Sequence, residues 1–449
     1  MKQRSQFVCQ QCGAVYAKWM GQCTNCNAWN SLVEQIAEPE LGKKSAIEKG
    51  KASGKKLNFA KLATIVPSDA KARLLTEFKD LNTVLGGGIL MGSVSLLAGQ
   101  PGMGKSTLLM QICATVAKEH DVLYVSGEES AGQVKLRALR LGAESDRLSF
   151  AASTSANDIA KTIESGEFDL VIVDSIQTLM MDEISSAPGT VSQVTNCGNL
   201  IIRAAKATDT AVVIVGHVTK DGTLAGPKVL EHLVDVVLNF EGDRYGGFKT
   251  VRAVKNRFGS TNEVAIFEML DSGLREVENP SAALLAERTN IDGSVILATL
   301  EGNRPLLVEI QALATTSNYG YPKRTASGFD LNRLNLLIAV LERRTKLRLS
   351  DKDIFINVVG GMKLNDSAAD LAVCMAIASA VAGRKLDEKY VVFGEVGLGG
   401  EIRSAFRADQ RIAEAKKLGF LHAIGPSTVH DKFVIPAKSL RETLIRYVK

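Results

Sequence analysis

The sequence lacks the features of a secreted or membrane-spanning protein. No apolar segment follows Met1, so we expect no signal peptide. The longest apolar run, residues 368–383, is short, rich in small residues and interrupted by Asp370, which favours a buried helix over a membrane span. We therefore expect a cytoplasmic protein that does not contact membranes.

Strong charge of either sign and internal repeats are missing as well. The net charge is +5. Such a mildly basic chain is compatible with nucleic-acid binding but does not indicate it. With 449 residues, 45% of them hydrophobic and 23% charged, the composition is typical of a globular protein of two or three domains.

Cysteine is scarce except at the N-terminus. Three of the seven cysteines are isolated, and we expect them to be small buried apolar side chains: Cys113, Cys197 and Cys374. The other four have the spacing C-x2-C-x10-C-x2-C, at Cys9, Cys12, Cys23 and Cys26. Two such pairs supply four thiolates for tetrahedral Zn²⁺ in a closed, structural site. A reducing cytoplasm disfavours the alternative of a disulfide pair, and the paired repeat disfavours a redox motif.

The clearest motif predicts nucleotide binding. It fits G-x-x-x-x-G-K-[ST] and is followed by Thr107: Gly99, Gln100, Pro101, Gly102, Met103, Gly104, Lys105 and Ser106. Residues 93–98 predict a buried strand before it, and residues 107–118 predict a helix after it. This context presents backbone N–H groups and a helix N-terminus to phosphates. We expect Lys105 to reach the β- and γ-phosphates of ATP and Ser106 to ligate Mg²⁺. The alternative is an ordinary glycine-rich turn.

Carboxylates at strand ends extend this site. Residues 168–174 form an apolar strand that ends in Asp174, as expected of a residue that holds Mg²⁺. Glu128 and Glu129 follow the predicted strand 122–126, at the carboxyl edge where such sheets bind ligands. Hydrolysis requires a base that orients the attacking water, and these two glutamates are candidates for it. The alternative is that both are exposed loop charges. For Glu129 we expect such a loop charge.

The chain divides into four predicted parts. Residues 1–33 form the cysteine module, and residues 34–61, rich in Lys, Glu, Gly, Ser and Ala, form a flexible basic linker. Residues 62–279 alternate apolar strands with helical stretches, which indicates a parallel α/β domain. Its expected strands are 93–99, 122–126, 170–174, 211–216, 234–240 and 250–254. Residues 280–449 have their own strands and helices, expected at 294–299, 331–343, 354–359 and 368–382.

Several segments together resemble a known family. They are the four-cysteine N-terminus, Leu-Gly-Gly-Gly-Ile at 85–89, Tyr-Val-Ser-Gly-Glu-Glu-Ser at 124–130, Gly-His-Val-Thr-Lys at 216–220 and Lys-Asn-Arg-Phe-Gly at 255–259. The central domain resembles the RecA-type P-loop ATPase core. Over nearly its full length the chain resembles the bacterial DNA-repair family RadA (Sms), whose signature is the last of these segments.

The resemblance implies roles for further residues. Glu128 matches the glutamate that activates water, and His217 matches a polar sensor of the γ-phosphate. A lone histidine is otherwise more often structural. Lys255 and Arg257 match positions from which a neighbouring subunit reaches the γ-phosphate, which implies a ring or filament. Similarity of the family to replicative helicases favours a homohexamer.

The resemblance also implies DNA partners. Two loops facing the ring channel, around 183–194 and 220–230, are expected to contact single-stranded or branched DNA. The second carries Lys220 and Lys228 among glycines, cations suited to a phosphate backbone. RecA recombinase is the protein partner that the family implies.

The C-terminal part resembles the α+β proteolytic domain of Lon proteases, which use a serine nucleophile and a lysine base. The resemblance puts Ala368 in the slot of the serine and Asp409 in the slot of the lysine, so we expect no peptidase activity. The remaining roles of this part are to supply contacts between subunits of an oligomer and a surface that binds DNA. A basic cluster could serve the second, although a solvated helix end is the favoured explanation of it: Arg343, Arg344, Lys346 and Arg348.

Three functions remain to be compared. The leading one is a DNA-stimulated ATPase, a motor on single-stranded DNA that extends joint molecules made in recombination. The second is an ATP-dependent protease of the Lon type, which the missing dyad disfavours. The third is a nucleotide-switched scaffold that binds partners through its zinc module.

Overall fold

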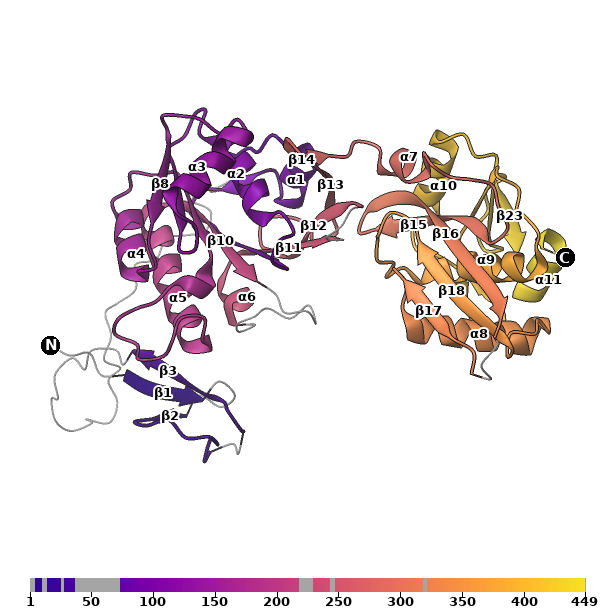
Figure 1. Cartoon of the computed structure of the whole chain (residues 1–449), viewed down its shortest axis with the longest axis horizontal. Helices are drawn as coiled ribbons and strands as arrows, with labels where there is room; N and C mark the ends of the chain where they lie inside the picture. Colours follow the sequence, from indigo (N-terminus) through magenta and orange to yellow (C-terminus); the bar gives the residue numbers. More distant parts are fainter. Residues whose placement is uncertain are drawn as a thin grey trace, which may run out of the picture. The chain divides into compact units, whose positions relative to one another are not determined.

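The computed structural model describes residues 5–9, 14–25, 28–36, 73–217, 229–242, 247–317 and 321–448. The chain forms two compact units, one of Met1–Phe240 with Ala253–Thr261 and the other of Glu241–Arg252 with Asn262–Lys449. It leaves the first unit within β11 (Val236–Gly242), returns within β12 (Lys249–Asn256) and leaves it again before β13 (Val264–Leu270). Figure 1 labels these three strands.

A small antiparallel sheet forms the N-terminal module. Its strands β1 (Ser5–Cys9), β2 (Val15–Tyr16) and β3 (Leu32–Ile36) have the order β2-β1-β3. Cys9, Cys23 and Leu32 form its buried core. So small a core stabilises a fold only weakly, and modules of this size usually depend on a cross-link such as a metal ion.

A parallel sheet forms the centre of the first unit, in the order β11-β6-β10-β9-β7-β8. Its strands other than β11 are β6 (Val94–Gly99), β7 (Val122–Ser126), β8 (Leu148–Ala152), β9 (Leu170–Asp174) and β10 (Ala211–His217). Parallel strands require crossover connections, which place helices on both faces. The predicted α/β class is therefore confirmed, although the sequence did not predict β8.

Alternate residues of these strands bury opposite faces of the sheet. Leu96, Val173 and Ile214 share a core with residues of α4 and α5, whereas Leu97 and Val213 lie against α1 and α2. The helices are α1 (Lys79–Val84), α2 (Lys105–Val116), α3 (Ala131–Arg140), α4 (Ala156–Glu164), α5 (Val191–Thr208) and α6 (Val229–Leu233). Two short strands, β4 (Arg73–Leu74) and β5 (Ile89–Leu90), and a 3-10 turn, Ile176–Thr178, complete the unit.

The second unit begins with antiparallel strands. Residues 249–252 of β12 pair antiparallel with β13, which pairs with β14 (Gly273–Glu276). The strand expected at 250–254 is thus present as part of β12, which belongs to the same nine-stranded sheet as β11 and β6 and pairs antiparallel with β13.

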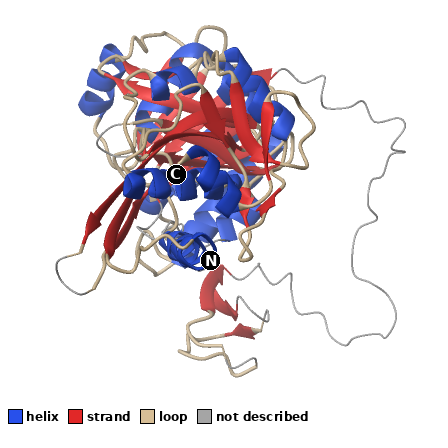
Figure 2. Ribbon diagram, turned by 90° about the vertical axis from the view of Figure 1, so that its right-hand side faces the viewer, coloured by secondary structure: helices blue, strands red, loops and turns tan. Residues whose placement is uncertain are grey.

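A second sheet follows, in the order β17-β18-β16-β15-β19-β22-β23. Its strands are β15 (Ser294–Glu301), β16 (Arg304–Thr316), β17 (Arg324–Ser327), β18 (Lys352–Val358), β19 (Tyr390–Val392), β22 (His422–Pro426) and β23 (Val434–Ala437). A two-stranded ribbon, β20 (Glu395–Val396) with β21 (Ile402–Arg403), lies in the same unit. Figure 2 faces this unit and shows strands in red and helices in blue.

Helices α9 and α10 pack against β15 and β16, and α7 packs against β16. The helices are α7 (Pro280–Leu285), α8 (Leu331–Thr345), α9 (Asp370–Ala382), α10 (Ala408–Lys417) and α11 (Leu440–Tyr447). Helix α9, in the longest apolar run, is buried over Asp370–Ser379, so the prediction of a buried helix is confirmed. Among the described residues no helix combines the length and apolar character that crossing a membrane requires.

Candidate nucleotide-binding site

The carboxyl ends of four parallel strands bring the predicted site residues together. The strand register pairs His217 of β10 with Gly99 of β6, and Asp174 of β9 with Ser126 of β7. The strand ends are therefore level, and the residues that follow them face one edge of the sheet. Open α/β sheets bind ligands at this edge.

The glycine-rich loop at 99–106 has the backbone that its sequence predicts. Gly102 and Gly104 have φ angles of 77° and 105°, which L-residues with a side chain rarely adopt. At Gly99 a Cβ atom would lie 2.6 Å from the carbonyl oxygen of Phe240, so a larger residue does not fit. Helix α2 begins at Lys105 directly after the loop, two residues before the helix start expected from the sequence. Its N-terminus faces the loop, as phosphate binding requires.

Lys105 lies inside the loop. Its side chain is buried, and its Nζ donates hydrogen bonds to the carbonyl oxygens of Gly99 (2.7 Å) and Gln100 (2.9 Å). Burial lowers the pKa of Lys105 to about 8, against the opposing charges of Asp174 and Glu128. The ammonium is thus poorly solvated, and the negative phosphate oxygens of a bound nucleotide would stabilise its positive charge.

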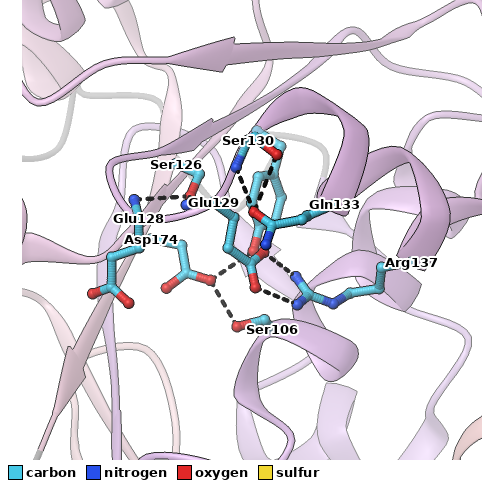
Figure 3. Close-up of polar contacts among 9 residues, drawn as sticks. Ser106, Ser126, Glu128, Glu129, Ser130, Gln133, Arg137 and Asp174 are labelled. Atoms are coloured by element: carbon cyan, nitrogen blue, oxygen red, sulfur yellow. Dashed lines mark hydrogen bonds and ion pairs between the residues drawn. The ribbon is translucent and has the colours of Figure 1, made fainter.

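Ser106 and Asp174 meet as the motifs predict. Ser106 Oγ donates to Asp174 Oδ2 at 2.8 Å (Figure 3). The buried Tyr124 hydroxyl donates to the same oxygen at 2.6 Å. A hydroxyl and a carboxylate side by side form the hard oxygen donor set that Mg²⁺ prefers. The two residues therefore fit a magnesium ion.

Glu128 extends from the end of β7 toward neighbouring strand ends. Ser175 Oγ donates to Glu128 Oε1 at 2.8 Å, and His217 Nε2 lies 3.6 Å from the same oxygen. Burial, and then the charge of Lys105, lowers the pKa of His217. The imidazole is therefore neutral at pH 7, and it lies close to Glu128 as a polar, uncharged neighbour.

The sequence predicted that Glu129 is an exposed loop charge, but its carboxylate has a protein partner in the structure. Both of its carboxylate oxygens accept hydrogen bonds from Arg137 of α3, at 2.6 and 2.5 Å. Figure 3 shows Glu129 pointing toward Arg137 and Glu128 pointing away from it. The two adjacent glutamates thus have different environments, and the expectation of an exposed loop charge at Glu129 is wrong because Arg137 binds its carboxylate.

Lys255 and Arg257 lie near the end of β12 and have partners within the same unit. Lys255 Nζ donates to the carbonyl oxygens of Glu231, His232 and Val234, at 2.9, 3.0 and 2.7 Å. Arg257 is half exposed, with its guanidinium 3.5 Å from Asp235. Both cations are therefore ordered in the single chain.

The glycines of two signature segments contact each other. A Cβ atom on Gly259 would lie 2.7 Å from Gly86 Cα, and one on Gly86 would lie 2.6 Å from the carbonyl oxygen of Phe258. Asn256 Nδ2 also donates to the carbonyl oxygen of Val84. The segments 85–89 and 255–259 therefore require glycine because their backbones touch.

Several predicted site residues lie outside the described part of the chain. These are Lys220 and Lys228 of the second DNA loop, and Cys12 and Cys26 of the cysteine module. Cys9 and Cys23 are described and share one buried core. Their backbone N–H groups donate to the carbonyl oxygens of Ala14 and Ala28, in each case five residues further along the chain. Cys9 and Cys23, one from each Cys-x2-Cys pair, supply thiols of the kind that bind zinc.

The three isolated cysteines are all buried, as expected. Burial raises the pKa of Cys197 to about 12, and it also raises the pKa values of Cys113 and Cys374 well above that of an ordinary thiol. Thiols of this kind are protonated and unreactive at neutral pH.

The Lon-like part carries no nucleophile where the resemblance would put one. Ala368 is buried in the 3-10 turn Ser367–Ala369, and Asp409 is exposed in the first turn of α10. The surrounding charges form closed pairs, Asp366 with the buried Arg411 and Asp370 with Arg333. The four cations of the basic cluster at 343–348 are exposed around the C-terminal end of α8.

Sequence reasoning missed three residues that hold the site in place: Tyr124, Ser175 and Arg137. Tyr124 resembles an ordinary core aromatic of a buried strand, and only its register beside β9 reveals its hydroxyl contact. Ser175 directly follows Asp174, so its position was a usable signal. Arg137 gave no signal, because its contact depends on the direction in which α3 leaves the loop.

Comparison with known proteins covers all parts of the chain. Residues 62–223 match the family model described as an AAA domain, residues 7–34 a rubredoxin metal-binding domain, and residues 334–428 subunit ChlI of Mg-chelatase. Among solved structures, the chain is similar to the RadB recombinase (TM-score 0.37, 20% identity, covering 46% of this chain and 100% of that one). It is also similar to a DnaB-like replicative helicase (TM-score 0.42, 14% identity, 47% and 63% covered).

Curated relatives extend over nearly the full length. The DNA repair protein RadA of Halalkalibacterium halodurans is 47% identical over 97% of this chain and 95% of its own length. Those of Bacillus subtilis and Pseudomonas aeruginosa are each 45% identical, over 97% and 95% of this chain and 95% and 93% of their own lengths. At 45–47% identity over nearly the full length of the chain, it belongs to the RadA family of bacterial DNA repair proteins.

Proposed function

We propose that the chain is a DNA-dependent ATPase of recombinational DNA repair. The observation that carries this proposal is the contact of Ser106 with Asp174 beside the buried ammonium of Lys105. A cation, a hydroxyl and a carboxylate at the N-terminus of α2 form the set of groups that binds a nucleoside triphosphate with its magnesium ion.

Hydrolysis in this site uses the chain's own carboxylate. Glu128 accepts the proton of the attacking water, and Ser175 fixes one of its oxygens so that the other is free. Lys105 binds the β- and γ-phosphates, and the neutral His217 contacts the γ-phosphate. Ser106 and Asp174 hold Mg²⁺, which neutralises charge on the phosphates when it is bound.

A second subunit completes the site. Lys255 and Arg257 approach the γ-phosphate of a neighbouring chain and stabilise the charge that develops on it in the transition state. The active form is therefore an assembly, and a homohexameric ring fits the family's similarity to replicative helicases.

DNA is the proposed track of this motor. The loop that carries Lys220 and Lys228 contacts the phosphate backbone of single-stranded DNA inside the ring. Movement along the strand extends joint molecules made by RecA. Branched DNA of this kind is the substrate on which the protein acts. Zn²⁺ bound by Cys9, Cys12, Cys23 and Cys26 stabilises the N-terminal module.

Peptidase activity is not proposed, because the slot of the serine holds the buried Ala368. A digestion assay with casein and ATP checks this point, and ATP-driven cleavage would contradict it.

ATPase assays on the purified full-length chain test the proposal. Single-stranded DNA should raise the rate, and Lys105→Ala should abolish both nucleotide binding and hydrolysis. Glu128→Gln should keep nucleotide binding but lose about 10²-fold or more in rate, since a general base contributes on that scale. Hydrolysis by Lys105→Ala at the wild-type rate would overturn the proposal.

A further inference from the structure

We propose that Arg137 is a positioning residue for Glu128, which it holds in place through the carboxylate of Glu129. This inference rests on the proposed function, because it assumes that Glu128 activates the attacking water. It adds a residue of α3 to the hydrolytic machinery, one whose guanidinium binds the carboxylate of Glu129.

The loop between β7 and α3 is fixed at its start by the backbone. Ser126 Oγ accepts the N–H groups of Glu128 (3.3 Å) and Glu129 (2.9 Å), and the N–H of Gly127 donates to the carbonyl oxygen of Asp174 at 3.0 Å. A Cβ atom on Gly127 would lie 2.1 Å from Thr178 Oγ1, so the loop also packs closely against the segment after β9. These contacts define where the loop begins.

Arg137 fixes the other side of Glu128. Its guanidinium binds both oxygens of Glu129 in a bidentate pair, and the hydrogen bonds raise the pKa of Arg137. The side chains are 18% and 31% exposed, so water competes weakly for them. Bidentate arginine–carboxylate pairs restrict orientation as well as distance. The pair therefore ties the residue next to Glu128 to the last turn of α3.

The start of α3 makes this connection stiff. Helix α3 begins after Ser130, whose backbone N–H and side-chain hydroxyl both donate to Gln133 Oε1. Figure 3 shows Gln133 and Arg137 on the same helix, with their side chains directed at Ser130 and Glu129. The helix is held in the fold by its own buried residues, Val134 and Ala138. The helix thus serves as a fixed base from which Arg137 holds the loop.

Glu128 depends on these two anchors because its own side chain has little support. It is 49% exposed, and its hydrogen bond from Ser175 fixes only one oxygen. Without Arg137, Glu129 would gain freedom and would also add an unpaired negative charge next to the catalytic carboxylate. Misplacement of a catalytic group by about 1 Å can cost up to about 10²-fold in rate.

A second ion pair on the same helix supplies the contrast. Lys135 binds Glu144 at 2.6 Å, but both side chains are more than half exposed, at 60% and 57%. Exposed pairs of this kind contribute little to stability, because water screens the two charges. Lys135 therefore carries the same charge on the same helix without contacting the loop, and Lys135→Gln is the matched control.

Steady-state ATPase kinetics of the full-length chain, with and without single-stranded DNA, test the inference. We expect Arg137→Gln to lower kcat about 10-fold, with the KM for ATP and the affinity for a fluorescent ATP analogue changed less than 2-fold. Arg137→Lys should recover part of kcat through a single hydrogen bond. The double variant Glu129→Gln, Arg137→Gln should lose no more than the worse single variant, and Lys135→Gln should equal the wild type.

Two results would overturn the inference while leaving the proposed function intact, provided that Glu128→Gln is inactive. One is a kcat of Arg137→Gln within 2-fold of the wild type. The other is an equal loss of nucleotide affinity and kcat, which would indicate a general structural role. If instead Glu128→Gln hydrolyses ATP at the wild-type rate, the proposed role of Glu128 fails, and the role of Arg137 fails with it.

Discussion

The ammonium of Lys255 lies 2.7 Å from the carbonyl oxygen of Val234, just beyond the end of α6. The carbonyl oxygens of Glu231 and His232 accept its two other hydrogen bonds. Cations are favourable at helix C-termini, where carbonyl groups lack partners within the helix. Lys255 therefore has a complete set of partners in the single chain, and a role in the neighbouring site requires it to exchange carbonyl oxygens for phosphate oxygens.

Replacing Lys255 by Met keeps most of the apolar stem and removes the charge. If Lys255 acts on a neighbouring γ-phosphate, the variant should lose about 10²-fold or more in kcat, since such cations contribute on the order of 10³–10⁵. Nucleotide binding should persist, because the P-loop is unchanged. A strand-exchange reaction with RecA should show a parallel loss of branch extension.

Mixing variants tests whether Lys255 acts in a neighbouring subunit. Lys255→Met and Glu128→Gln are each inactive by expectation, but a mixed assembly contains sites with one intact Glu128 and one intact Lys255 from different chains. ATPase activity of the mixture should therefore exceed the sum of the two separate variants. Activity equal to that sum would argue that both residues serve the same chain.

Tyr124 should affect magnesium binding through Asp174. Its hydroxyl donates to the same Asp174 oxygen as Ser106. Tyr124 therefore orients the carboxylate that holds Mg²⁺ and is not itself a ligand of the metal. Residues that orient metal ligands typically change metal affinity 10- to 100-fold. Tyr124→Phe should raise the Mg²⁺ concentration for half-maximal ATPase activity about 10-fold. Tyr447→Phe is the control, because this buried hydroxyl has no hydrogen-bond partner among the described residues, and it should change nothing.

The parts of the site that follow from local sequence were predictable. The loop at 99–106 specifies its own backbone through Gly102 and Gly104, and an apolar strand that ends in Asp174 specifies the position of its carboxylate. The contact of Glu129 with Arg137 joins residues eight positions apart across a loop and a helix start. Its geometry depends on the entry angle of α3, which Ser126 and tertiary packing determine.

The fold shows the same division. The strands β6, β7, β9 and β10 are runs of buried apolar residues, and the sequence predicted all four. Strand β8, Leu-Ser-Phe-Ala-Ala, is short and partly exposed at the edge of the sheet. Such a segment has little of the hydrophobic pattern that identifies a central strand. The hairpin of β12 and β13 was missed because pairing direction is a tertiary property.

The contact of Gly259 with Gly86 predicts a cost in stability. In Gly259→Ala the new methyl group would meet the backbone of Gly86 at 2.7 Å, and overpacking of this kind typically costs about 1–3 kcal/mol. Gly132→Ala is the matched control, since nothing lies within 4 Å of its Cβ position in α3. Alanine should stabilise a helix there by about 0.5–1 kcal/mol. Urea unfolding measures both changes, and equal stabilities of the two variants would contradict the prediction.

The lowered pKa of Lys105 predicts that ATP affinity depends on pH. In the free protein burial brings this pKa to about 8, so the ammonium is charged at pH 7 and mostly neutral at pH 9. The charges of Asp174 and Glu128 act against this lowering, and burial also lowers the pKa of the neighbouring His217. ATP affinity should therefore fall about 10-fold between pH 7 and pH 9, and binding at pH 9 should take up a proton, because phosphate oxygens restore the charge on Lys105. Calorimetric titration in buffers of different ionisation enthalpy measures both. Lys105→Arg keeps its charge across this range, so its affinity, although weaker, should not change with pH. An equally flat profile for the wild type would show that the buried ammonium does not titrate.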